Sequence, residues 1–218
     1  MGKIPDVRRN IREDIVAGRL GLGSRVTIDE LALRYGVSHM PIREALRELH
    51  GEGLVVIEPN RGARVRPIDL SFVENFFDTR SALEVVLTRR AARRCTPALL
   101  SRLHRLEDEL EDHMQAGDSA AILAANRAFH QLIYEQAGNQ DAIAVVDRHW
   151  LLIAALWGRY GYGEERFVGV ANDHRHILFA LENADGEAAG ALMTAHVLKA
   201  KQDLMRRMSA ASPLEKAS

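Results

Sequence analysis

The sequence predicts a mainly α-helical protein in which an N-terminal winged helix-turn-helix is followed by an all-α helical bundle. Residues 28–66 hold two helix-like segments joined by a tight turn and then a basic hairpin. The segment 69–208 has helical periodicity without a strand pattern, and capping residues and glycines divide it into about six helices. We therefore expect a domain at 1–68, a second at 69–208, and a frayed polar tail at 209–218.

The first helix of the helix-turn-helix is expected between Thr27, which can cap its N-terminus, and Gly36, which ends it. Leu31, Ala32 and Tyr35 would form its buried stripe, because they recur at helical spacing.

The second helix is expected to start at Ser38, whose oxygen can cap it, with Pro41 in the first turn, where its missing N–H costs nothing. Its apolar face would consist of Ile42, Ala45, Leu46 and Leu49. The opposite side would carry His39, Arg43 and Arg47 at successive steps of four residues, and we expect these three to face DNA.

A basic hairpin is expected next, from the runs LVVIEP and ARVRP joined by Asn60, Arg61 and Gly62. Such a turn can lie against a DNA backbone or in a minor groove. A capped amphipathic helix with two arginines is common on protein surfaces. The order of a two-helix turn, a basic helix and a basic hairpin within about forty residues instead indicates a DNA-binding domain.

Composition agrees with this division of the chain. The net charge is −1, yet residues 1–68 hold 12 Lys and Arg against 9 Asp and Glu, so positive charge lies where phosphates would be met. The single cysteine, Cys95, excludes an internal disulfide and a cysteine-rich zinc site. Because no apolar run is long enough to span a bilayer and no signal peptide opens the chain, we expect a cytoplasmic protein without a membrane partner.

The second domain shows clear helix punctuation. Ser71 and Glu74 can form a capping box at its first helix. Further N-terminal signals and interrupting glycines follow at Thr96, Asp118, Asn139 and Asp185, and at Gly117, Gly138 and Gly186.

Several histidines of the second domain are candidate metal ligands. Asn126 and His130 are four residues apart and share a helix face, while His174 and His196 lie on two later helices, so three helices could converge on one point. His174 and His176, two residues apart, cannot face the same way. Spacing alone leaves open whether these histidines bind a metal or belong to the core or surface.

The run from IREDIVAG to RGARV resembles the DNA-binding domain of the GntR family of bacterial transcription regulators. The matching positions include Gly36, Val37, Ser38, Pro41, Arg43, Glu44, Ala45, Leu46, Gly53, Leu54, Arg61 and Gly62. The resemblance implies that Arg43 reads a guanine, to which a guanidinium can donate two hydrogen bonds. It gives as DNA-binding candidates Ser38, His39, Met40, Pro41, Arg43, Arg47, Arg61 and Gly62. His39 stands where the family usually has an arginine, so the operator is expected to depart from the family pattern.

The second domain resembles the FCD type of ligand-binding domain found in the FadR subfamily, through the motifs NRAFHQLIYEQAGN, DHRHILFAL and ADGEAAGALMTAH. The resemblance implies a divalent metal held by Asn126, His130, His174 and His196, with zinc or nickel favoured by the imidazoles. Asn126 replaces an aspartate of the family and removes one negative charge.

The same resemblance gives Arg80 and Asn139 as effector-binding candidates. For Arg80, a surface salt bridge with Glu84 is the alternative.

We therefore expect a ligand-responsive bacterial transcription regulator that binds a near-palindromic double-stranded DNA operator as a homodimer. A small carboxylate bound at the metal site would modulate its affinity for DNA. The alternatives are a metal-responsive or ligand-independent regulator of the same fold, a helical interaction module, and a metal-dependent hydrolase. An enzyme is not expected, because no HExxH or comparable arrangement supplies a general base.

Overall fold

The computed structural model describes residues 6–58, 62–161 and 164–211. Contacts between Cα atoms divide the chain into an N-terminal unit, Met1–Asp69 with Leu151–Arg159, and a helical unit, Leu70–Trp150 with Tyr160–Ser218. No local pattern in the sequence indicates that Leu151–Arg159 groups with the N-terminal residues. The domain limits at 68 and 208 therefore stay predictions.

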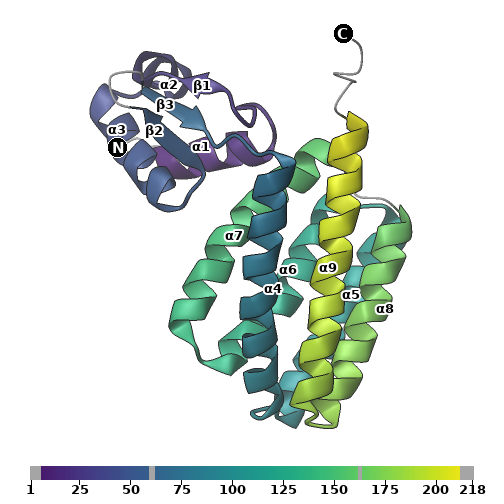
Figure 1. Ribbon diagram of the computed structural model, residues 1–218. Helices are drawn as coiled ribbons and strands as arrows, with labels where there is room; N and C mark the ends of the chain where they lie inside the picture. The colour runs from purple at the N-terminus through teal and green to yellow at the C-terminus, as the bar shows by residue number, and fades with distance from the viewer. Residues whose placement is uncertain (1–5, 59–61, 162–163, 212–218) are drawn as a thin grey trace. The chain divides into compact units, whose positions relative to one another are not determined.

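The N-terminal unit is a winged helix-turn-helix (Figure 1). Its elements run in the order α1 (Val7–Val16), β1 (Arg25–Val26), α2 (Ile28–Tyr35), α3 (His39–Gly51), β2 (Val55–Glu58) and β3 (Gly62–Val65). The predicted pair of helices and the predicted hairpin are confirmed. The sequence reading did not place α1 or the short strand β1.

Helix α2 begins and ends where the sequence predicts. The Thr27 side chain accepts a hydrogen bond from the Glu30 N–H, the Glu30 carboxylate accepts one from the Thr27 N–H, and Gly36 closes the helix with φ of 64°. Ser38 stands at the N-cap of α3 with extended backbone angles, so the predicted start of this helix is confirmed. Its side chain makes no capping hydrogen bond, so the predicted side-chain cap is wrong. Ser38 is exposed.

The wing is a three-stranded antiparallel sheet in the order β1-β3-β2. Gly62 opens β3 with φ of 88°, and a Cβ there would lie 3.1 Å from the Val26 carbonyl oxygen, so glycine lets β3 approach β1. Asn60 and Arg61 of the predicted turn lie outside the described residues. Arg64 of β3 pairs with Glu58 of β2 at 3.0 Å.

Six helices follow the wing in the described residues, as predicted. They are α4 (Leu70–Ala92), α5 (Pro97–Ala116), α6 (Ser119–Ala137), α7 (Gln140–Tyr160), α8 (Glu164–Glu182) and α9 (Gly186–Ala211). All belong to the helical unit except Leu151–Arg159 of α7, which groups with the N-terminal unit. Helix α4 packs against α6 and α9, and α8 packs against α5 and α9. Figure 1 shows α4, α9 and α8 running side by side.

Most of the predicted helix ends are confirmed in the helical unit. The side chains of Thr96, Asp118, Asn139 and Asp185 each accept a backbone hydrogen bond at the start of a helix. Ser71 is an exception.

Helix α4 starts at Leu70, directly after Asp69, so Ser71 lies inside the helix and the predicted capping box at Ser71 is wrong. Aspartate is itself a preferred N-cap residue, which explains the earlier start. At the C-terminal end of the helical unit, α9 continues to Ala211. The expectation of a frayed tail from residue 209 is therefore wrong for residues 209–211.

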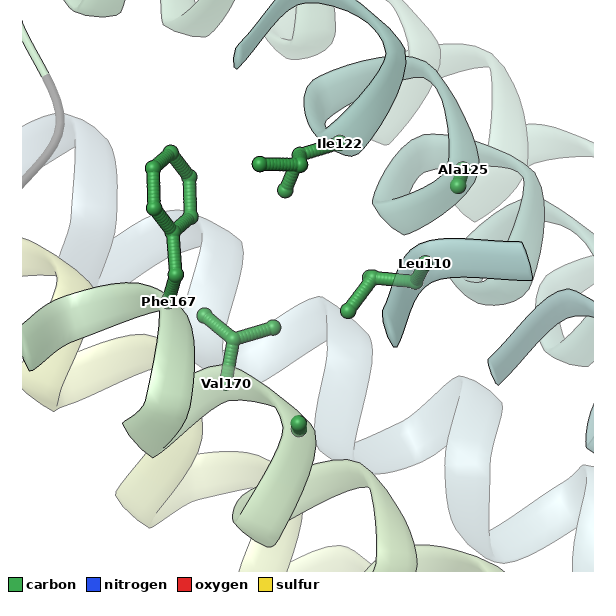
Figure 2. Close-up of a cluster of buried hydrophobic side chains, with 6 residues drawn as sticks. Leu110, Ile122, Ala125, Phe167 and Val170 are labelled. Carbon is green, nitrogen blue, oxygen red and sulfur yellow. The ribbon is translucent and has the colours of Figure 1, made fainter. Parts of the chain in front are cut away.

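The core of the helical unit is built from the apolar faces of its helices. Figure 2 shows Leu110 of α5, Ile122 of α6, and Phe167 and Val170 of α8 pointing toward one another, and Ala125 and Ala171 complete this cluster. None of the helices in the described ranges is both long enough and apolar enough to cross a membrane.

Candidate metal centre and nucleic-acid interface

Helix α3 has a buried apolar side and an exposed polar side. Ile42, Ala45, Leu46 and Leu49 are buried, as predicted. Arg43 and Arg47 are exposed, and within the described part of the chain neither pairs with an acidic side chain. The side of α3 that faces solvent therefore presents positive charge that can meet DNA phosphates and bases.

The start of α3 carries the remaining exposed candidates. Met40 is 63% exposed. His39 Nε2 lies 3.1 Å from a carboxylate oxygen of Asp29 in α2, so the histidine that departs from the family pattern already has an acidic neighbour.

A groove of about 380 Å³ lies between α3 and the wing, with Arg43 and Arg47 on one side and Glu58 and Gly62 on the other. It brings the predicted recognition helix and the start of β3 to a common surface. Arg61, the predicted wing contact, lies outside the described residues.

Three histidines from three helices meet inside the helical unit. His130 of α6, His174 of α8 and His196 of α9 are all buried, and each offers a ring nitrogen such that the three nitrogens lie within 4.8 Å of one another. The Nε2 atoms of His130 and His196 are 3.2 Å apart. Two unprotonated imidazole nitrogens at this distance repel each other unless a proton or a cation lies between them.

Each of the three rings has a partner at Nδ1, on the side away from the meeting point. A Glu107 oxygen lies 2.7 Å from His174 Nδ1, and an Asp173 oxygen lies 3.3 Å from His196 Nδ1.

His130 Nδ1 has two neighbours, the Tyr134 hydroxyl at 3.1 Å and a Glu84 oxygen at 3.6 Å. Acceptors at Nδ1 favour the tautomer that carries its proton there, which leaves Nε2 free to bind a metal.

Ring orientation and protonation state agree with ligation. Phe129 stacks on His174, with centroids 4.1 Å apart and planes 9° from parallel. Burial lowers the pKa of His130 and of His196 well below 6.5, and the His174 imidazole and the guanidinium groups of Arg80 and Arg166 lower both further. The two histidines are therefore neutral at physiological pH, the form that binds metal ions.

His174 Nε2 and Asn126 Oδ1 are among the buried atoms that lack hydrogen-bond partners in the described residues. An unpaired buried polar atom is costly, and a lone pair left without a donor is what a metal ligand offers before it binds. Asn126 lies one helical turn before His130 on α6 and is 7% exposed. These residues therefore fit a tetrahedral or larger divalent metal site with nitrogen and oxygen ligands.

Arg80 is buried, so the alternative of a surface salt bridge is wrong, although its predicted partner is correct. The guanidinium pairs with Glu84, a fully buried residue one turn along α4, and lies 4.6 Å from the centroid of the Trp150 ring. Burial by itself lowers the pKa of Arg80, but the neighbouring Glu84 and Tyr134 outweigh burial and raise it. Arg80 is thus a charged group inside the bundle.

Two further candidates have roles away from the histidines. Asn139 follows α6 and caps α7 through a 3.3 Å hydrogen bond from the Ala142 N–H, so its side chain is accounted for without an effector. His176 is exposed, as expected for the residue two positions after His174.

Sequence reasoning missed the groups that hold the histidines. Glu107 and Asp173 were not singled out, and Glu84 was named only as a partner of Arg80, because a carboxylate on a helix reads as an exposed residue until its partner on another helix is known. Arg166 was also missed; it is buried, donates to the His196 carbonyl oxygen at 3.2 Å, and lies 3.6 Å from Asp173. The only signal in the sequence was the position of Asp173 beside His174.

A winged helix-turn-helix joined to a helical domain with a buried polar centre defines a ligand-binding transcription regulator as the class of protein. Comparison with known families agrees. Residues 4–65 match the family described as bacterial regulatory proteins, gntR family, and residues 75–199 match the FCD domain. The chain belongs to the GntR family of bacterial transcription regulators and carries an FCD ligand-binding domain.

Similar proteins are regulators as well. The chain is 30% identical over 198 residues to the HTH-type transcriptional repressor RspR of Escherichia coli (strain K12), covering 88% of this chain and 84% of that protein. The same figures describe its similarity to a probable D-xylose utilization operon transcriptional repressor of Paenarthrobacter nicotinovorans. The solved structure of E. coli McbR/YncC shares the fold, with a TM-score of 0.78 at 21% identity over 92% of this chain and 96% of that chain.

Proposed function

We propose that this regulator binds a near-palindromic operator as a homodimer in the cytoplasm and that a small carboxylate, bound at a divalent metal in the helical unit, modulates its affinity for DNA. The observation that carries the proposal is the meeting of three buried imidazoles whose Nδ1 atoms are all held by other groups. Metal binding is the role that best accounts for this arrangement.

His130, His174 and His196 would hold the metal through Nε2, and Asn126 would offer its amide oxygen. The donor set favours zinc or nickel over magnesium, because imidazole suits the softer cations. When bound, the metal supplies positive charge and open coordination positions to an anionic ligand.

The charges around the histidines support an anion as that ligand. The buried carboxylates of Glu84, Glu107 and Asp173 are matched in number by the cations of Arg80, Arg166 and Lys199. Asn126, which is neutral, does not offset the charge of a divalent cation. A bound metal would therefore leave uncompensated positive charge in a buried site, and a carboxylate would balance it.

A metal-responsive regulator without an organic effector is the second candidate. The observation that favours it is the Arg80–Glu84 ion pair, because an arginine that already has a buried acidic partner is less available to an incoming carboxylate. The two candidates share the metal site and differ in whether an acid adds anything to it.

Metal analysis and ligand titration together test the proposal. We expect the purified protein to hold up to one zinc or nickel ion per chain, and His174→Ala and His196→Ala to lose it, while His104→Ala and His113→Ala keep it. Circular dichroism would check that each variant is folded. Equal metal content in all four variants would overturn the metal site.

A thermal-shift screen of small organic acids, run on metal-loaded and metal-stripped protein, then separates the two candidates. We expect an acid to raise the melting temperature of the metal-loaded protein only. If no acid does so while metal removal changes affinity for operator DNA, the metal-responsive candidate is correct.

A further inference from the structure

We propose that Met40 reads the 5-methyl group of a thymine in each operator half-site and thereby sets one position of the sequence that this regulator recognises. The inference rests on the proposed binding of an operator through α3. It concerns which chemical feature of the bases this chain selects.

The direction of Met40 on α3 is the first argument. At about 100° per residue, Met40, Glu44 and Arg47 project within about 30° of the direction opposite to the buried side of the helix, and Met40 lies at the centre of this group. Arg43 projects further to one flank. A helix that enters the major groove with its buried side toward the protein core would therefore present Met40 most directly to the base edges, with Glu44 and Arg47 on either side of it.

Exposure is the second argument. Met40 is 63% exposed, although methionine is an apolar side chain that gains from burial. It lies on the margin of a groove of about 850 Å³ together with Arg43, whose charge attracts DNA to the same surface. Positive charge beside an exposed apolar side chain suits the major groove, where phosphates flank the bases.

The chemistry of the side chain then selects the base. A methionine thioether has no hydrogen-bond donor and is only a weak acceptor, so it cannot distinguish the polar edges of guanine, cytosine or adenine. Thymine alone among the bases presents a methyl group in the major groove, and apolar side chains contact it.

The neighbouring residue strengthens the argument. His39, the other side chain at the start of α3, has its Nε2 3.1 Å from the Asp29 carboxylate. In the first turn of the helix, the His39 imidazole thus already has the Asp29 carboxylate as a partner, and the Met40 thioether remains available to a base. In this chain the contact that distinguishes bases at that point is apolar rather than a hydrogen bond.

The test begins with an operator selected from a random duplex library by the full chain. Each thymine of the operator is then replaced in turn by deoxyuridine, which removes the methyl group and keeps base pairing. We expect one replacement per half-site to weaken binding by about fourfold, the effect of losing burial of one methyl-sized group.

Variants assign this effect to Met40. Met40→Ala and Met40→Gln should bind the thymine and deoxyuridine operators equally well, and Met40→Leu should keep the preference for thymine. Leu33→Ala, which removes another exposed apolar side chain, in α2, should keep the parental preference and is the matched control.

Indifference of the parent protein to every deoxyuridine replacement would overturn the inference, and so would an undiminished preference in both Met40→Ala and Met40→Gln. Failure to select any operator would overturn the proposed DNA-binding function, and the inference with it.

Discussion

A carboxylate oxygen of Glu107 lies 2.7 Å from His174 Nδ1, and the two residues belong to different helices, α5 and α8. Both are buried, and the other Glu107 oxygen has no hydrogen-bond partner among the described residues. The contact with His174 Nδ1 is therefore the main polar contact of the Glu107 carboxylate among the described residues. It fixes the tautomer and the orientation in which His174 Nε2 meets the other two histidines.

Glu107→Gln should weaken metal binding without removing a ligand. An amide accepts a weaker hydrogen bond and can present its NH₂ group instead, so His174 loses its fixed tautomer. We expect metal affinity to fall by about 10- to 100-fold, as for other partners of metal-ligating histidines. Competition with a chromogenic chelator measures this. Glu111→Gln, one turn further along α5 and paired with exposed Arg175, is the control and should leave affinity unchanged.

Asn126→Asp should strengthen metal binding, because it adds a negative charge at an atom that has no partner among the described residues. The same chelator competition should show a lower dissociation constant for the variant. Asn183→Asp, an exposed asparagine at the end of α8, is the matched control. An Asn126→Asp affinity equal to that of the parent would show that residue 126 does not ligate the metal.

Arg43→Ala should cost roughly 1–3 kcal/mol of operator binding per half-site and relax the preference for guanine at one position. Arg61→Ala should instead weaken binding to all sequences and reduce its dependence on salt, as expected for a phosphate contact. Binding titrations at several salt concentrations, on operator and on scrambled DNA, separate the two effects. Parental affinity and specificity in Arg43→Ala would show that α3 is not the recognition helix.

Arg80→Ala should destabilise the helical unit by about 3–5 kcal/mol, because it leaves the Glu84 carboxylate buried without its cation. The double variant Arg80→Met with Glu84→Gln should recover most of that stability, since it removes both charges. Urea unfolding of the parent, of Arg80→Met and Glu84→Gln as single variants, and of the double variant measures the coupling. Additive losses would contradict a coupled pair. Any loss of effector response in Arg80→Ala alone has to be interpreted against this loss of stability.

Asp14 makes the stability of the N-terminal unit depend on pH in the acidic range. Burial favours a raised pKa, but the Tyr35 hydroxyl and the cations of Arg19 and Arg34 outweigh it and lower the pKa of Asp14 below 3.8. The carboxylate therefore stabilises the fold at pH values above 3.8, and this contribution is lost as the pH falls through the lowered pKa.

Asp14→Asn should destabilise the N-terminal unit at neutral pH by about 1–3 kcal/mol, the cost of weakening a buried hydrogen-bonded charge. Its free energy of unfolding should also decline less than that of the parent when the pH is lowered from 5 to 3. Asp6→Asn, at the exposed start of α1, is the control. Parallel pH profiles for parent and Asp14→Asn would exclude a role for this carboxylate.

The helices and the hairpin could be predicted because local signals specify them. Thr27, Gly36, Asp118 and Gly117 act on backbone atoms a few residues away, so their effect is visible in the sequence. The convergence of His130, His174 and His196 could be inferred only through family resemblance, since spacing along the chain does not determine where separate helices meet.

What escaped prediction depends on tertiary contact. Strand β1 is two residues long and exists only because β3 lies beside it. Glu107 belongs to the candidate site only because α5 packs against α8. Neither relationship has a local sequence signal.

The neutral amide at position 126 also bears on how this regulator can change over generations. Asparagine and aspartate codons differ by a single nucleotide, so one transition in the gene would convert the uncharged oxygen beside the three histidines into a carboxylate. Selection could therefore adjust the affinity of the proposed metal site with one of the smallest steps available to it.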